Sequence, residues 1–230
     1  SIRRRQRQMC IRDRWNAKTY TPSGVMNVSE NKDKYHNRVK KKAIPYPWEG
    51  LNKKLEGLRT GELVLVAGGT GLGKTAVTRE LEHWLIKQTE DNIGIVALEE
   101  DWTRTVDGIL SIEANAKLHI DRIREEHSKE ELDILFDDLF IDNDNNDRVW
   151  IHAHFGSNDI DGIFSKLRYM IVGCECKWVV IDHLHMMVSA TLEGDERRSI
   201  DSIMTRLRSL AEETGACLLY TSPSPRDSDS

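Results

Sequence analysis

"GELVLVAGGTGLGKTAVTRELEHW", residues 61–84, decides the fold of this 230-residue chain. The apolar run at 63–67 has the length and β-branched content of a strand. A glycine-rich loop with the pattern G-x-x-x-x-G-K-[ST] follows at 68–75, and apolar residues from Val77 onward then recur at helical spacing. A strand, a glycine loop and a helix in this order are typical of a phosphate-binding loop.

The loop predicts which residues hold a nucleotide. Its glycines let successive backbone N–H groups point at a polyphosphate, and the helix end adds partial positive charge. Lys74 would bridge the β- and γ-phosphates, and Thr75 would ligate Mg²⁺. The alternative, a glycine turn with an incidental Lys-Thr pair, is disfavoured by the strand and helix on either side. The predicted nucleotide-binding residues are Gly68, Gly69, Thr70, Gly71, Leu72, Gly73, Lys74 and Thr75.

Further strands alternate with helices along the chain. Apolar runs at 93–98, 149–154 and 178–182 predict strands, and helical spacing recurs at 160–171 and 200–211. Another helix begins at Ser128, which forms a capping box with Glu131. This alternation predicts an α/β fold with a mainly parallel sheet covered by helices on both faces.

Two acidic positions follow predicted strands. Asp182 ends the strand at 178–182, at the edge where ligands bind in such sheets, and is the expected magnesium-side acid. Glu99 follows the strand at 93–98, with Glu100 and Asp101 beside it, and its carboxylate could polarise a water near the γ-phosphate. An ordinary acidic helix start explains Glu99 equally well, so the pattern leaves both interpretations open.

Four segments together resemble the helicase domain of DnaB-type ring helicases, among them the phage primase-helicases and Twinkle. They are "PWEGLNKKLEGLRTGELVLVAGGTGLGKT", "LEED", "VVIDHLHMMVSA" and "DERRSIDSIMTRLRSLAEETG". The resemblance covers about residues 45–216 and implies a RecA-like P-loop NTPase core. It implies that Glu99 is the catalytic base beside the catalytic Lys74, and that Asp182 holds the magnesium shell with Thr75.

The same resemblance implies an NTP-dependent replicative DNA helicase that forms a homo-hexameric ring. Its substrate would be ATP or another NTP or dNTP with Mg²⁺, and its partners single-stranded DNA and a replisome polymerase and primase. Residues 183–198 look like the loop that faces the ring channel, so Arg197 and Arg198 are candidate DNA contacts; a solvated helix start is the alternative. Another RecA-like ATPase, such as a recombinase or clock-type ring ATPase, and a nucleotide-binding fragment without turnover remain open.

The two ends of the chain resemble translated sequencing-library adapters. We therefore expect adapter-derived residues at 1–14 and 217–230, a linker or arm at 15–44, and an ATPase domain at 45–216 that is incomplete on its C-terminal side. A basic nucleic-acid-binding arm is the alternative for the first segment. The family's sensor, DNA loop and arginine finger are not assigned to Ser222, Arg226 or other tail residues, so this chain alone is not expected to unwind DNA.

Composition narrows the classes further. The chain is 39% hydrophobic and 31% charged, with no apolar run near the roughly 18 residues that span a bilayer. We expect one cytoplasmic domain, in a phage-infected host or a bacterium, with no membrane partner. Its 4 cysteines show neither a disulfide framework nor zinc spacing. We expect a hydrated turn at 142–147, and structural roles for His152 and His154.

Overall fold

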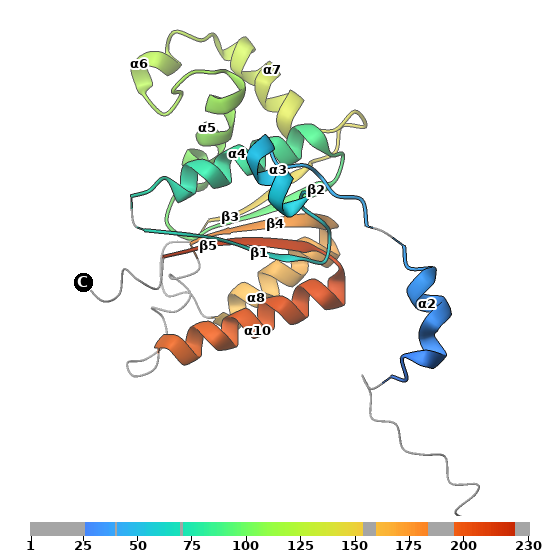
Figure 1. Ribbon diagram of the computed structural model, residues 1–230. Helices are drawn as coiled ribbons and strands as arrows, with labels where there is room; N and C mark the ends of the chain where they lie inside the picture. Colours follow the sequence, from blue (N-terminus) through green and yellow to red (C-terminus); the bar gives the residue numbers. More distant parts are fainter. Residues whose placement is uncertain (1–25, 40, 70, 154–159, 184–195, 224–230) are drawn as a thin grey trace, which may run out of the picture. The chain divides into compact units, whose positions relative to one another are not determined.

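The computed structural model describes residues 26–39, 41–69, 71–153, 160–183 and 196–223 (Figure 1). They contain a five-stranded sheet in the order β1-β5-β4-β2-β3. Each neighbouring pair of strands is parallel, which confirms the predicted α/β class. The strands are β1 (Leu63–Gly68), β2 (Asn92–Ala97), β3 (Val149–Ala153), β4 (Cys176–Asp182) and β5 (Cys217–Pro223).

Helices cover both faces of the sheet, as the alternating pattern predicts. Figure 1 shows α4 and α5 over one face, and α8 and α10 over the other. The capping box of Ser128 and Glu131 is present at the start of α7. The predicted helix at 160–171 is α8 followed by a π-helical turn, η2. The helices of this unit are α3 (Glu49–Leu55), α4 (Lys74–Gln88), α5 (Trp102–Glu113), α6 (Asp121–Arg124), α7 (Lys129–Phe140), α8 (Ile160–Arg168), η2 (Tyr169–Gly173) and α10 (Glu196–Thr214).

Strand β4 divides the core into two layers because successive side chains point to opposite faces. Trp178 and Val180 pack in the cluster that includes buried residues of α4 and α5. Val179 and Ile181 pack in the cluster that includes buried residues of α8 and α10. A strand buried on both faces reads as a continuous apolar run, which is why 178–182 was recognisable from sequence.

Strand β5 lies between β1 and β4 and joins the first strand to the rest of the sheet. Leu218 and Leu219 are buried on opposite faces of the sheet. This segment is part of the tail predicted to be adapter-derived, and its apolar residues fill a central strand position. The strand continues through Thr221, which donates a hydrogen bond to Asp182.

The chain divides into two compact units, residues 1–40 and 41–230. In the described part of the first unit, η1 (Ser29–Asn31) and α2 (Lys32–His36) bury no side chain. In the second unit, Ile44 and Leu58 exchange backbone hydrogen bonds of 2.8 and 2.7 Å. The folded unit thus begins slightly before the domain boundary predicted at residue 45.

Candidate active site

The carboxyl ends of β1, β4 and β2 deliver three loops to one edge of the sheet. All three strands are parallel, and the register pairs Ala97 of β2 with Asp182 of β4. The glycine loop follows β1, Asp182 ends β4, and the acidic turn, which we define as residues 98–101, follows β2. Since ligands bind at the carboxyl ends of parallel strands, this edge is the candidate active site.

The glycine loop has the backbone geometry of a phosphate cradle. Gly71 and Gly73 have φ of 77° and 83°, in the left-handed region that favours glycine. Gly73 is also the N-cap of α4, whose first N–H groups lack partners within the helix. The Nζ atom of Lys74 donates to the carbonyls of Gly68 at 2.8 Å and Gly69 at 3.0 Å, which holds the ammonium at the loop.

The loop is open to solvent at its tip. Gly71, Leu72 and Gly73 are exposed, and so is Thr75 in the first turn of α4. A phosphate group can therefore reach the helix N-terminus, and the Thr75 hydroxyl is accessible to a metal ion beside it. Thr70, also predicted to bind nucleotide, lies outside the described residues.

Asp182 is buried at the end of β4, with 5% of its surface exposed. Its Oδ1 atom accepts a hydrogen bond of 2.5 Å from the Thr221 hydroxyl of β5. Its backbone carbonyl accepts from the N–H of Leu98 at 2.7 Å, which ties β4 to the start of the acidic turn. A buried carboxylate at the phosphate edge is chemically suited to a magnesium shell, either directly or through bound water.

Glu99 lies beside the residue that follows Asp182. Its Oε1 atom is 3.9 Å from Nδ1 of His183, and its side chain is 49% exposed. The structure thus brings Glu99 and the Asp182–His183 segment together at the candidate site. A half-exposed carboxylate at this edge can meet both water and a bound nucleotide.

Asp101, and not Glu99, starts the helix that follows. Helix α5 begins at Trp102, and the Asp101 carboxylate accepts from the N–H of Thr103 at 3.3 Å and from its hydroxyl at 2.5 Å. The hydroxyl bond from Thr103 lowers the pKa of Asp101 below its usual value. Glu99 lies outside the helix, so capping does not account for its position.

The sequence analysis missed a buried polar cluster behind the acidic turn. Arg79 of α4 contacts Glu82 of its own helix at 2.5 Å and forms an ion pair with Glu100. The Thr105 hydroxyl of α5 donates to Glu100 at 2.8 Å and accepts from Arg79 at 3.2 Å. Burial raises the pKa of Glu82 to about 7, against the opposing effect of Arg79. The signal in the sequence was an Arg and a Glu spaced i, i+3 along the apolar face of α4.

Other predicted positions have plainer surroundings. Asp142 accepts backbone hydrogen bonds from Asp144 and Asn146, which folds residues 142–147 into a turn, and the bonds from Asn146 lower the pKa of Asp142. Nε2 of His152 lies 3.1 Å from Nζ of Lys166. His154, residues 184–195 and the side chains of Arg197 and Arg198 lie outside the described residues.

Thiols and metal-ligand types are dispersed across the part of the chain that the structure describes. Cys174, Cys176 and Cys217 are buried free thiols. Among the described residues, no three His, Cys, Asp or Glu side chains gather into a set that could hold a metal ion. A magnesium ion here would therefore depend on the nucleotide and water for most of its ligands, which is usual for Mg²⁺ bound with phosphates.

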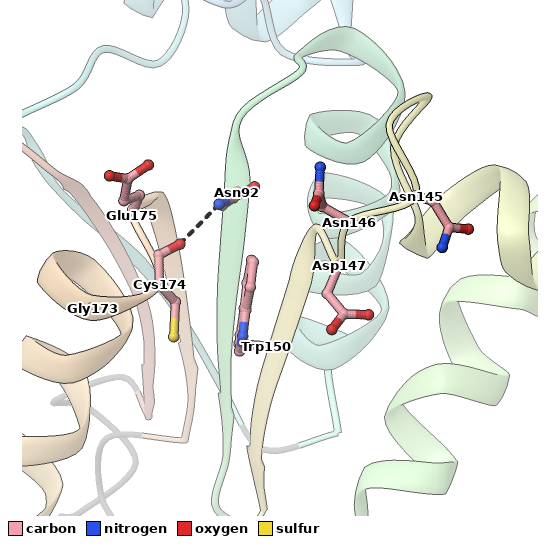
Figure 2. Close-up of a pocket in the computed structure, with 8 residues that line it drawn as sticks. All are labelled: Asn92, Asn145, Asn146, Asp147, Trp150, Gly173, Cys174 and Glu175. Carbon is pink, nitrogen blue, oxygen red and sulfur yellow. Dashed lines mark hydrogen bonds between the residues drawn. The ribbon is translucent and has the colours of Figure 1, made fainter.

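A pocket of about 410 Å³ lies away from the candidate site (Figure 2). It is lined by Asn92 at the start of β2, Trp150 of β3 and Glu175 just before β4. Asn92 donates a hydrogen bond of 2.8 Å to the carbonyl of Cys174 across this pocket. Its lining comes from the amino ends of the strands, so it is separate from the phosphate edge.

Comparison with known proteins identifies the family. The pattern of the DnaB-like helicase C-terminal domain matches residues 43–230. The chain belongs to the DnaB-like helicase family. It is 30% identical over 211 residues to the DNA helicase/primase of Enterobacteria phage T3, which covers 89% of this chain and 37% of that protein. The chain thus spans little more than a third of this curated relative.

Solved structures show the same fold as this DnaB-like domain. A solved ATPase domain matches with a TM-score of 0.65 and 18% identity, over 88% of this chain and 72% of that one. A KaiC-like protein from the hyperthermophilic archaeon Pyrococcus horikoshii OT3 matches with a TM-score of 0.55 and 19% identity, over 81% of this chain and 73% of that one. The predicted RecA-like ATPase fold is therefore confirmed. Among the described residues of this DnaB-like domain, no helix is both long and apolar enough to cross a membrane.

Proposed function

We propose that this domain is the NTP-hydrolysing motor of a replicative DNA helicase. DnaB-like proteins are a family of NTP-hydrolysing helicases, which favours this function over a recombinase or a clock-type ring ATPase. The observation that carries the proposal is the convergence of Lys74, Asp182 and Glu99 at the carboxyl ends of three parallel strands. These are the residue types that phosphate binding, metal binding and water activation each require.

Each residue has a proposed role that its position supports. The loop amides and the α4 N-terminus would hold the phosphates of ATP or another NTP or dNTP, with Lys74 turned from its loop carbonyls onto the β- and γ-phosphates. Thr75 and Asp182 would hold Mg²⁺, which neutralises charge on the transferred phosphate. Glu99, half-exposed at the same edge, would orient and deprotonate the attacking water.

We further propose that the intact protein works as a homo-hexamer on single-stranded DNA, in a replisome that contains a polymerase and a primase. Family membership supports these partners, and the 30% identity to a phage helicase/primase supports the replication setting. Arg197 and Arg198 remain proposed DNA contacts. The residues from 217 onward remain proposed as adapter-derived, and 230 residues of this composition are proposed to bind nucleotide without measurable unwinding.

The experiment compares nucleotide binding with turnover in single variants. We expect Lys74→Ala to raise the dissociation constant of a fluorescent Mg·ATP analogue by about a hundredfold, since the lost group is a charged phosphate partner. We expect Glu99→Gln to bind the analogue normally and to lose single-turnover hydrolysis. Lys53→Ala and Glu80→Gln, both at exposed positions, serve as controls.

Normal binding by Lys74→Ala would refute the phosphate site. Hydrolysis by Glu99→Gln at the parent rate would refute the role of Glu99. Binding without any hydrolysis in the parent would favour the nucleotide-binding fragment over the motor. Robust unwinding by this chain alone would refute the proposed dependence on residues that it lacks.

A further inference from the structure

The acidic turn that carries Glu99 is tied to the helix that follows the glycine loop. Arg79 lies in the second turn of α4, five residues after Lys74, and its side chain is buried. Its guanidinium group reaches Glu100, the residue next to Glu99, and the two form an ion pair. The contact therefore joins the candidate base to the phosphate-binding helix through side chains that touch neither nucleotide nor metal.

The path of the Arg79 side chain is enclosed by α5. Thr105 is fully buried and bonds both to Arg79, at 3.2 Å, and to Glu100, at 2.8 Å. A Cβ atom at Gly108 would lie 2.9 Å from Cδ and Nε of Arg79. Glycine at this helical position thus leaves the space through which the arginine side chain passes. Three elements, α4, the acidic turn and α5, are consequently fixed to one guanidinium group.

The guanidinium group is suited to this role because it is a planar donor with several N–H groups in fixed directions. One of its nitrogen atoms contacts Glu82, and the other serves both Glu100 and Thr105. A lysine ammonium carries the same charge but is a compact point on a flexible stem, so it cannot reproduce this arrangement. Replacement by Lys therefore separates the requirement for charge from the requirement for geometry.

We propose that Arg79 is a positioning residue that holds Glu99 at a fixed place relative to the phosphate cradle. The inference rests on the proposed function of Glu99 as the base that activates water. Glu99 itself is half-exposed, and no described contact shorter than its 3.9 Å approach to His183 fixes its carboxylate. Its position is instead set by its neighbour Glu100, through Arg79 and Thr105. A carboxylate that must align a water with a phosphate tolerates little displacement, because small misplacements cost large factors in rate.

The test uses Thr105→Val, which keeps the side-chain shape and removes the hydroxyl, and Arg79→Lys, which keeps the charge. Thr103→Val is the matched control: it removes a hydroxyl-carboxylate bond of the same acidic turn, to exposed Asp101, without touching the Arg79 cluster. Hydrogen exchange of the amides at 98–104 reports whether the turn is held, and thermal unfolding verifies that each variant is folded. Neither measurement needs turnover.

We expect exchange at 98–104 to accelerate by at least about fivefold in Thr105→Val and Arg79→Lys, and to stay near the parent rate in Thr103→Val. We expect the Mg·ATP dissociation constant to stay within about twofold while single-turnover hydrolysis falls by about tenfold or more. A merely structural role would not divide binding from turnover in this way. In a Glu99→Gln background, Thr105→Val should cause no further loss of hydrolysis, because both changes act on the same step.

Unchanged exchange in both cluster variants would overturn the inference whether or not the chain hydrolyses nucleotide. Accelerated exchange with unchanged hydrolysis would also overturn it, since the turn would then be held without consequence for the reaction. A further loss of hydrolysis in the Glu99→Gln background would assign Arg79 to another step and equally refute the positioning of Glu99. If the parent binds nucleotide and never hydrolyses it, the proposed function fails, and the positioning role falls with it while the exchange result stands.

Discussion

Substitution of Glu82 by Gln should change how stability depends on pH. Glu82 is fully buried on α4, and its neighbours are Arg79 on the same helix and, farther off, Asp182 at the end of β4. Arg79 is shared with Glu100, so one cation serves two carboxylates. Burial is the largest cause of the raised pKa of Glu82, Arg79 opposes it, and the negative charge of Asp182 adds to it.

The magnitude follows from the two pKa values. Burial raises the pKa of Glu82 from its ordinary value of 4.5 to about 7. The folded state therefore holds the proton more tightly than the unfolded state between these values. Because each tenfold change in proton affinity is about 1.4 kcal/mol, the protonated carboxyl contributes stability on the order of 3 kcal/mol. This stability is fully present below pH 4.5 and is lost as the pH rises through about 7.

Glutamine at position 82 keeps an oxygen acceptor for Arg79 and cannot ionise. We expect the free energy of unfolding of the parent, relative to Glu82→Gln, to fall by roughly 3 kcal/mol between about pH 4.5 and pH 8. Urea denaturation followed by circular dichroism at several pH values measures this difference. Glu80→Gln, exposed on the same helix, should give a difference that is flat with pH.

A flat difference for Glu82→Gln would refute the raised pKa. A difference that grows in favour of the parent with rising pH would show that the attraction to Arg79 outweighs burial. The buried cluster would then be a stabilising ion pair, and the reasoning about shared charge would be wrong.

Two other predictions concern the core and the thiols. Leu207 of α10 is fully buried between the helix and the sheet, so Leu207→Ala should lower the free energy of unfolding by about 2–5 kcal/mol in urea denaturation; a loss below about 1 kcal/mol would contradict the packing. Burial raises the pKa of the Cys176 and Cys217 thiols to about 12, so both should react slowly with a thiol reagent at pH 8 until the protein is denatured. Rapid reaction of either thiol in the native protein would contradict its burial.

The strands and the glycine loop were predictable because their signals are local. The apolar runs at 63–67, 93–98, 149–154 and 178–182 coincide with β1 to β4 within two residues at each end. The capping box at Ser128 is a pattern of four consecutive residues and was equally legible. Sheet edge, loop and helix order then followed from general rules of parallel sheets.

The polar cluster behind Glu99 was not predictable, because it depends on tertiary packing. Arg79 and Glu100 are 21 positions apart along the sequence, and only the approach of α5 to α4 brings them together. Trp102 shows the same limit: sequence favoured the core for most tryptophans, but this one is 53% exposed beside the acidic turn. Residue type predicts burial only on average, and α5 starts where the chain leaves the sheet.

Helix α4 joins phosphate binding to the placement of the acidic turn because of its own periodicity. Thr75, Thr78, Arg79 and Glu82 are spaced i, i+3, i+4 and i+7, so they form one stripe from the candidate metal site into the core. A buried ion pair is a poor source of stability, and well-packed apolar residues often serve as well or better. If Glu82 costs stability near neutral pH, as predicted, the stripe is better explained by what it positions. The first turn of the helix would hold the nucleotide, and the second would hold the turn that carries Glu99.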